Sequence, residues 1–389
     1  MEKKTIAFVV QRYGEDVNGG AEYHCRVLAE HLTEMYNVVV LTSCARSYTP
    51  WDNFYQAGKE QINGVTVIRF SVDRIRNDRN LAYLTAEIDH GNMEKEQEWI
   101  EELGPYCPKL IDYVTENSEN YKVVIFFGYA FYTTVAGLER GLKNAILIPT
   151  AHDEPNIYRH IYIDVIKKAK SILYNSIEER DFLIEHFHTE DKLSDLTCVG
   201  IDIPQLDDES VPEAFRKYEN YIIYVGRISP GKNFYQLNRY FLEYKKRNPS
   251  DLKLLVIGRS DNYFKIINHA DIIYTGFVSE EEKTRLIKNA KILIMPSKWE
   301  SLSLVILESM AVRRPILVNG ECAVLKGQCI RSNAGLYYTN YKEFEYTLNY
   351  MLTDKEAYNQ MCENGLEFVR KNYNWDIVVN NVSALIEKI

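Results

Sequence analysis

Residues 296–311 read Pro296-Ser297-Lys298-Trp299-Glu300-Ser301-Leu302-Ser303-Leu304-Val305-Ile306-Leu307-Glu308-Ser309-Met310-Ala311. The apolar run at 292–295 before this stretch is short enough to be a buried parallel strand. Ser301 and Ser303 are good N-cap residues, and an apolar segment without Gly or Pro follows them. The stretch therefore predicts a strand, a loop and a helix start. Ligands of open α/β sheets bind outside the carboxyl ends of strands, so this loop is a candidate binding site.

Two carboxylates bracket the loop. Glu300 lies within it, and Glu308 lies in the following helix among Leu, Val, Ile and Met. A helix N-terminus offers N–H groups to an anion. A carboxylate on an apolar face needs a partner, and sugar hydroxyls can supply one. The alternative is a capping carboxylate and a helix charge that turns to solvent.

The composition is that of a soluble globular protein. A chain of 389 residues is long enough for two domains, and its 46% hydrophobic and 26% charged residues are ordinary. A net charge of −9 argues against a nucleic-acid binder. The seven cysteines show no metal-ligand spacing and indicate reduced thiols in a cytosolic protein. We expect no signal peptide, and no segment approaches the ~20 apolar residues of a membrane span.

Short apolar runs recur along the chain between amphipathic segments and predict an α/β protein with two domains. The predicted strands are 5–10, 38–41, 65–70, 123–127, 145–149, 171–176, 196–202, 221–226, 253–259, 272–278, 292–295 and 315–318. The segment 205–213 is acidic, contains proline and is the best candidate linker. The predicted domains are therefore 1–204 and 220–372, joined by a linker at 205–219 and followed by an amphipathic helix within 373–389.

Two features of the first half are candidate ligand contacts. Gly19 and Gly20 open a helix after the first strand, which suits close approach of the backbone to an anion. The GxGxxG fingerprint of a dinucleotide site is missing. His152 follows the strand 145–149, and an imidazole there can donate to a sugar or phosphate oxygen. The alternatives are an ordinary glycine-containing loop and a structural histidine bonded to a backbone carbonyl.

The loop after the strand 221–226 carries two cations, Arg227 and Lys232. Residues 226–233 nearly spell the Walker A pattern, but Asn233 replaces the Ser or Thr that binds magnesium, which disfavours a P-loop NTPase. Arg227 offers a planar fork of donors and Lys232 a point charge, both suited to a diphosphate. The alternative is a pair of solvated surface cations.

In order and spacing, these motifs resemble the GT4-like retaining glycosyltransferases, also called glycosyltransferase group 1, which have the GT-B fold. The resemblance spans nearly the whole chain. It implies two Rossmann-like parallel-sheet domains that face each other across a cleft, with a C-terminal helix that crosses back onto the first domain. The pair Glu300 and Glu308 resembles the family's Glu-x7-Glu signature, and residues 226–233 resemble its Gly-Arg-x4-Lys-Asn signature.

The resemblance also implies a role for each candidate residue. Arg227 and Lys232 grip the diphosphate, Glu308 binds the ribose and Glu300 lies beside the donor sugar. The intervening backbone, which comprises Ser301, Leu302, Ser303 and Leu304, holds the diphosphate. The family usually has glycines after the first Glu, so serine here departs from the pattern at a position of close approach to phosphate.

Three further assignments follow from the resemblance. Gly19 and Gly20 reach the distal phosphate of the donor, and His152 contacts the donor sugar. Phe277 and Val278 border the nucleobase, with a plain core strand end as the alternative. His152, Arg227, Lys232 and Glu300 are the expected catalytic residues.

The expected activity is retaining, hexosyltransferase-type transfer from a UDP- or GDP-sugar to an acceptor hydroxyl, as in surface-polysaccharide or glycoconjugate assembly. The acceptor would be a saccharide, a lipid-linked sugar or another glycoconjugate. The chain has no Asp-x-Asp, and no metal or other cofactor is expected. The alternatives are a nucleotide-sugar epimerase and a non-catalytic nucleotide-sugar-binding homologue. We expect a cytoplasmic protein. The lysines of 167–170 are interpreted as a solvated face, with peripheral contact to the inner membrane as the alternative.

Overall fold

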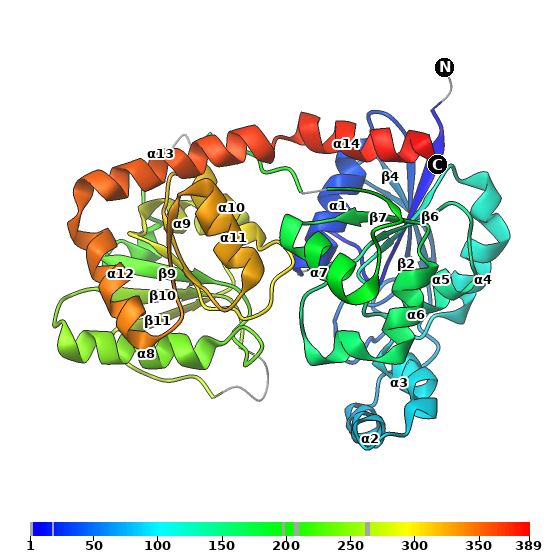
Figure 1. Ribbon diagram of the computed structural model, residues 1–389, viewed down its shortest axis with the longest axis horizontal. Helices are drawn as coiled ribbons and strands as arrows, with labels where there is room; N and C mark the ends of the chain where they lie inside the picture. Colours follow the sequence, from blue (N-terminus) through cyan, green and yellow to red (C-terminus); the bar gives the residue numbers. More distant parts are fainter. Residues whose placement is uncertain (1–2, 18, 197–198, 206–209, 261–264) are drawn as a thin grey trace. The chain divides into compact units, whose positions relative to one another are not determined.

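The computed structural model describes residues 3–17, 19–196, 199–205, 210–260 and 265–389. The chain forms two compact units (Figure 1). The N-terminal unit comprises Met1–Val199 and Trp375–Ile389, and the C-terminal unit comprises Gly200–Asn374. Residues 206–209, which fall in the predicted linker, lie outside the described residues.

The N-terminal unit contains, within the described residues, an eight-stranded sheet in the order β3-β4-β2-β1-β5-β6-β7-β8. The strand pairs are parallel except for the antiparallel pair of β3 and β4. The strands are β1 (Thr5–Val10), β2 (Asn37–Ser43), β3 (Gly58–Ile62), β4 (Val65–Phe70), β5 (Val124–Phe127), β6 (Ala145–Ile148), β7 (Ser171–Tyr174) and β8 (Leu193–Leu196).

The unit also contains helices, several of which pack against the two faces of this sheet. They are α1 (Gly20–Leu32), α2 (Asp78–Asp89), α3 (Glu96–Leu103), α4 (Pro108–Asn117), α5 (Tyr132–Glu139), α6 (His160–Lys168), α7 (Ile177–Phe187) and α14 (Trp375–Lys388), with short 3-10 turns η1 (Met93–Lys95), η2 (Ser118–Asn120) and η3 (Pro155–Tyr158). The last helix, α14, lies beside α1 (Figure 1). The C-terminal helix therefore packs on the N-terminal unit, as the sequence predicted.

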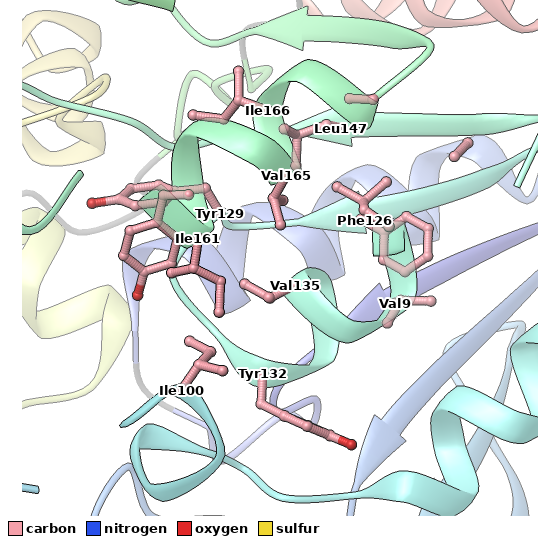
Figure 2. Packing of buried hydrophobic residues seen from close by; sticks show 14 of the residues in the cluster. Val9, Ile100, Phe126, Tyr129, Tyr132, Val135, Leu147, Ile161, Val165 and Ile166 are labelled. Atoms are coloured by element: carbon pink, nitrogen blue, oxygen red, sulfur yellow. The ribbon is translucent and has the colours of Figure 1, made fainter. Parts of the chain in front are cut away.

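The core follows from the alternation of side chains along β1. Ile6 and Phe8 join the cluster under α1 and α14, whereas Ala7 and Val9 join the cluster under the helices of the other face. Figure 2 shows this second cluster, in which Val9 and Phe126 lie near Val135 of α5. The central strands β1, β5 and β6 are buried on both faces and are therefore mostly apolar, which explains why they are visible in the sequence.

The C-terminal unit contains, within the described residues, a six-stranded parallel sheet in the order β11-β10-β9-β12-β13-β14. In chain order this is 3-2-1-4-5-6, the arrangement of a Rossmann-like domain. The strands are β9 (Tyr221–Val225), β10 (Lys253–Ile257), β11 (Ile272–Gly276), β12 (Leu293–Met295), β13 (Ile316–Asn319) and β14 (Gly335–Tyr338). The helices are α8 (Phe234–Arg247), α9 (Glu280–Asn289), α10 (Leu304–Ala311), α11 (Ala323–Ser332), α12 (Tyr341–Thr353) and α13 (Lys355–Asn372), with the 3-10 turn η4 (Glu213–Phe215).

The α/β class and the two parallel sheets are thus confirmed, but one predicted strand is wrong. The sequence predicted a strand at 196–202, whereas β8 ends at Leu196 and residues 199–202 form no strand; 197–198 lie outside the described residues. The β8 strand is a half-exposed edge strand with the sequence Leu-Ser-Asp-Leu, so it lacks an apolar run. The sequence analysis also missed β3, which is exposed, and β14.

Two further expectations concern the whole chain. The six described cysteines are free and buried, and Cys198 lies outside the described residues. Among the helices of the described residues, none combines the length and the apolar character that crossing a bilayer requires.

Candidate functional site

The C-terminal unit has its topological switch point between β9 and β12, which are neighbours in the sheet. The chain continues from these two strands toward opposite edges, so the loops that follow them border the crevice where α/β domains bind ligands. The loop 226–233 follows β9 and carries Arg227 and Lys232. The loop 296–303 follows β12 and carries Glu300.

Lys232 and Glu300 form an ion pair across these two loops. Lys232 Nζ lies 2.6 Å from Glu300 Oε1, and the side chains are 29% and 12% exposed. Asn233 Nδ2 donates to the Pro296 carbonyl at 3.2 Å and ties the loops together a second time. The structure therefore brings two of the predicted catalytic residues together and leaves both within reach of solvent.

Arg227 is exposed at the start of the same loop, and its carbonyl accepts a hydrogen bond from Tyr224 at 2.7 Å. The loop after β10 approaches closely, because a Cβ on Gly258 would lie 2.0 Å from the Gly226 carbonyl oxygen. Only glycine fits there, and its φ of +138° is one that glycine tolerates. The backbone of Arg227 is thus held in place, while its side chain is exposed.

The segment 301–304 forms the turn into α10. Ser303 is the N-cap, as predicted, but it has φ 65° and its side chain makes no capping hydrogen bond. Side-chain capping requires an extended N-cap backbone, whereas Ser303 adopts the left-handed conformation that favours glycine. Leu302 is buried and its carbonyl accepts from Gln328 Nε2 at 2.6 Å. Ser301 is half-buried and Leu304 begins the helix, so main-chain N–H groups are what this turn can offer a ligand.

Glu308 neither turns to solvent nor lacks a protein partner. Lys283 Nζ lies 3.1 Å from its Oε1 and 3.0 Å from its Oε2. Sequence reasoning missed Lys283, because its partner lies 25 residues away and no local motif links the two. The only signal in the sequence was the position of Glu308 on an apolar helix face. This position indicates that the carboxylate has a partner but does not identify the partner.

Phe277 and Val278 follow β11, which ends at Gly276. The Phe277 ring is 50% exposed, and the Arg259 guanidinium lies 4.5 Å from its centroid. Phe277 is therefore not a core residue at a strand end, whereas Val278 is half-buried. The predicted capped helix follows directly, with Ser279 and Glu282 in a capping box at the start of α9.

In the N-terminal unit, Gly19 and Gly20 are exposed and form the N-cap and first residue of α1. Behind them Arg12 and Glu22 form a buried ion pair, with Nη2 2.5 Å from Oε1. Arg12 Nη1 also donates to the Arg46 carbonyl at 2.9 Å. A Cβ on Gly19 would lie 2.1 Å from Glu22 Oε2, so a larger residue at position 19 would displace this carboxylate from its ion pair.

His152 lies in the loop after β6, where Thr150 has φ 51°. His152 Nδ1 is 3.8 Å from Glu154 Oε1, which is longer than a hydrogen bond. Asp153, the other carboxylate beside it in sequence, accepts from the Tyr158 hydroxyl at 2.7 Å.

The buried carboxylate of Glu179 holds the loop after β6 in place. Glu179 accepts hydrogen bonds from the backbone N–H groups of Ala151 and Asn175, and so links the loops after β6 and β7. Burial raises the pKa of Glu179 to about 8, although these hydrogen bonds favour the ionised form. Sequence reasoning missed Glu179, which looks like an ordinary acidic residue in the first turn of α7.

The geometry of the C-terminal unit agrees with its sequence family. Residues 207–368 match the family model described as glycosyl transferases group 1. The matched residues include Arg227, Lys232, Glu300, Lys283 and Glu308.

The chain is also similar to several curated proteins. An uncharacterized glycosyltransferase of Methanocaldococcus jannaschii is 24% identical over 215 residues, which are 53% of this chain and 50% of that protein. The chain spans about half the length of the curated relatives it matches.

Similarity to solved structures extends over the full length. Sucrose-phosphate synthase from Thermosynechococcus elongatus has a TM-score of 0.73 at 16% identity, with 99% of each chain covered. Anabaena HepE in complex with UDP-glucose has a TM-score of 0.72 at 12% identity, covering 99% of this chain and 100% of HepE. At this identity the likeness establishes the fold alone, and it confirms the predicted GT-B fold.

Proposed function

We propose that this protein is a retaining glycosyltransferase that moves a sugar from a nucleotide-sugar donor to an acceptor hydroxyl. The observation that carries the proposal is the pairing of Lys232 with Glu300 at the switch point of a group 1 domain. Anions are favoured at such a place by the cations and by the N-terminus of α10. HepE, which shares the fold, has been crystallised with UDP-glucose, and we propose a donor of the same class, a UDP- or GDP-sugar.

In this proposal each charged residue has one task. Arg227 and Lys232 bind the diphosphate, which gains negative charge as the bond between the anomeric carbon and the phosphate oxygen breaks. Fixed cations stabilise that charge more in the transition state than in the ground state. Glu300 positions the donor sugar and does not attack it, and Glu308 binds the ribose. Phe277 and Val278 border the nucleobase.

Retention of anomeric configuration would follow from reaction on one face of the sugar. The acceptor oxygen bonds to the anomeric carbon on the side from which the diphosphate leaves. A phosphate oxygen of the leaving group takes the proton from the acceptor hydroxyl, so that charge and atoms balance without a protein nucleophile. In the N-terminal unit, the roles of Gly19, Gly20 and His152 stay predictions.

We also propose that no metal or other cofactor is needed, because side-chain cations and helix N–H groups supply the positive charge. The acceptor class we propose is a saccharide, a lipid-linked sugar or another glycoconjugate, in surface-polysaccharide or glycoconjugate assembly. A cytoplasmic site of action belongs to the same proposal, with peripheral contact to the inner membrane as the alternative. Activity should persist in EDTA; its loss, with recovery on addition of manganese, would contradict metal independence.

The test begins with a thermal-shift screen of nucleotides and nucleotide sugars, which identifies the donor through the stabilisation a bound ligand confers. The selected donor is then incubated with and without candidate acceptors, and the products are analysed. A transferase gives an acceptor-dependent glycoside with retained configuration and only slow donor hydrolysis alone. A new nucleotide sugar formed without acceptor would instead identify an epimerase, and binding without turnover of any donor would identify a non-catalytic protein.

A further inference from the structure

We propose that Lys283 is a positioning residue that fixes the Glu308 carboxylate and thereby sets how strongly the site discriminates ribose from deoxyribose. The inference rests on the proposed function, because it takes Glu308 as the carboxylate that binds the ribose.

The contacts of Lys283 join two helices. Its ammonium group lies 3.1 Å and 3.0 Å from the two oxygens of Glu308 on α10 and 2.6 Å from Glu280 Oε2 on α9. The side chain of Lys283 is 15% exposed and that of Glu308 is 23% exposed, whereas that of Glu280 is 76% exposed. Contact with both carboxylate oxygens restricts rotation of the Glu308 carboxyl group.

Lys283 itself is held on a rigid element. It follows the capping box in which Ser279 Oγ accepts from the Glu282 N–H and Glu282 Oε2 accepts from the Ser279 N–H. Such a box fixes the first turn of a helix. The helix start therefore sets the position of the lysine, and the lysine sets the position of the carboxylate on the neighbouring helix.

The electrostatics keep Lys283 ionised. Burial alone lowers the pKa of Lys283, but Glu308 and Glu280 together raise it well above its ordinary value. The exposed Glu280 is screened by water, so Glu308 is the more effective partner. A hydrogen bond between two charged groups is stronger than one between neutral groups, which makes Lys283 an effective clamp on Glu308.

A clamped carboxylate can still bind hydroxyl groups. Its two oxygens have about four acceptor sites, and a single ammonium group does not fill them. We expect ribose hydroxyls to donate to the remaining sites, with little cost of ordering because Glu308 is already fixed. Without Lys283 the carboxylate would be mobile and would repel the nearby diphosphate more strongly.

The test is calorimetric titration of the full chain with UDP and GDP and with their 2′-deoxy and 3′-deoxy analogues. For wild type we expect the ribose form to bind about tenfold more tightly than at least one deoxy analogue, as for a hydrogen bond to a charged acceptor. Lys283→Met should weaken binding of the ribose form about tenfold. The ratio of the affinities for the ribose and deoxyribose forms should then be close to one. The matched control is Lys253→Met, which breaks a similar pair in the same unit, with Nζ 2.5 Å from Asp271 Oδ1, and should keep the wild-type ratio.

A double variant covers the case in which Lys283→Met does not fold because Glu308 is left unpaired. Glu308→Gln should lower the ratio by itself, and adding Lys283→Met to it should change the ratio no further. An additional loss in the double variant, or a wild-type ratio in Lys283→Met, would overturn the positioning role alone. A wild-type protein that binds no nucleoside diphosphate would overturn the proposed function as well.

Discussion

Lys232 Nζ lies 2.6 Å from Glu300 Oε1, although the two residues are 68 positions apart in the sequence. They belong to the loops after β9 and β12, which the sheet places side by side. Each charge is therefore neutralised by the other. A diphosphate bound at this place would compete with Glu300 for the lysine.

This competition predicts opposite effects on binding for the two partners. Glu300→Gln should tighten nucleoside diphosphate binding about three- to tenfold, because Lys232 loses its internal anion, while turnover falls. Lys232→Ala should weaken binding and lower turnover by about two to four powers of ten if the lysine stabilises the leaving group. Calorimetry and initial rates measure the two effects.

The control for both variants is Lys298→Ala. Lys298 lies in the same loop as Glu300, and its exposed ion pair with Glu321, at 3.3 Å, would be lost. It should leave binding and turnover unchanged. Weaker binding in Glu300→Gln, or an unchanged rate in Lys232→Ala, would remove the pair from the reaction.

Ser303→Gly should stabilise the protein. Ser303 has φ 65°, and a left-handed conformation costs an L-residue about 1–2 kcal/mol that glycine avoids. Allowing for the greater freedom of glycine in the unfolded chain, the free energy of unfolding should rise by about 0.5 kcal/mol. Ser301→Gly, two residues earlier and without a positive φ, should lower it. Urea denaturation compares the two, and equal losses would show that the turn is not strained.

Gly19→Ala and Gly20→Ala should differ although the residues are adjacent. A Cβ at position 19 would lie 2.1 Å from Glu22 Oε2 and 3.2 Å from Arg12 Nη2, whereas position 20 has open space. Gly19→Ala should therefore destabilise the protein by about 1–3 kcal/mol through overpacking. Gly20→Ala, at the first position of α1, should stabilise it by about 0.5 kcal/mol. Similar denaturation midpoints for the two variants would contradict the role assigned to the buried Arg12–Glu22 pair.

Stability should fall with rising pH between about 6.5 and 8. Burial raises the pKa of Glu179 from 4.5 to about 8, so above pH 4.5 the folded chain holds a proton that the unfolded chain has lost. Burial lowers the pKa of His24 from 6.5 to about 3, which has the opposite sign and cancels this effect up to pH 6.5. Between pH 6.5 and 8 the contribution of His24 no longer changes, and Glu179 lowers stability with a slope of up to about 1.4 kcal/mol per pH unit.

The variant Glu179→Gln separates the contributions of Glu179 and His24 to the pH dependence of stability. It should lose the fall between pH 6.5 and 8 and should instead gain stability as pH rises from 5 to 6.5, because His24 then acts alone. Urea denaturation at pH 5, 6, 7 and 8 measures both slopes. An unchanged fall above pH 6.5 in the variant would exclude Glu179 as its source.

Much of the fold could be predicted from the sequence, because most of its strands are buried on both faces. Runs such as 123–127 and 145–149 are apolar, and the structure confirms them as β5 and β6. The edge strands β3 and β8 escaped prediction for the opposite reason. One side of an edge strand faces solvent, so polar residues such as those of Leu193–Leu196 carry no buried-strand signal.

Some residues of the candidate site could also be predicted from the sequence, whereas others could not. Local motifs indicated Lys232 and Glu300, and the parallel sheet explains why their loops meet. The partner of Glu308 could not be predicted, because Lys283 approaches it from another helix and only the packing of α9 against α10 brings the two together. The partners of Glu179 could not be predicted either, because Ala151 and Asn175 lie in the loops after two neighbouring strands, β6 and β7.

The central proposal is that the group 1 domain binds a nucleoside diphosphate through Arg227, Lys232 and Glu308. A crystal structure of the protein with the nucleoside diphosphate selected by the thermal-shift screen tests it most directly. We predict that Lys232 leaves Glu300 to contact a phosphate oxygen, that Arg227 contacts the diphosphate and that Glu308 accepts hydrogen bonds from the ribose while Lys283 still holds it. A bound nucleotide with all three side chains pointing away from it would contradict the proposal.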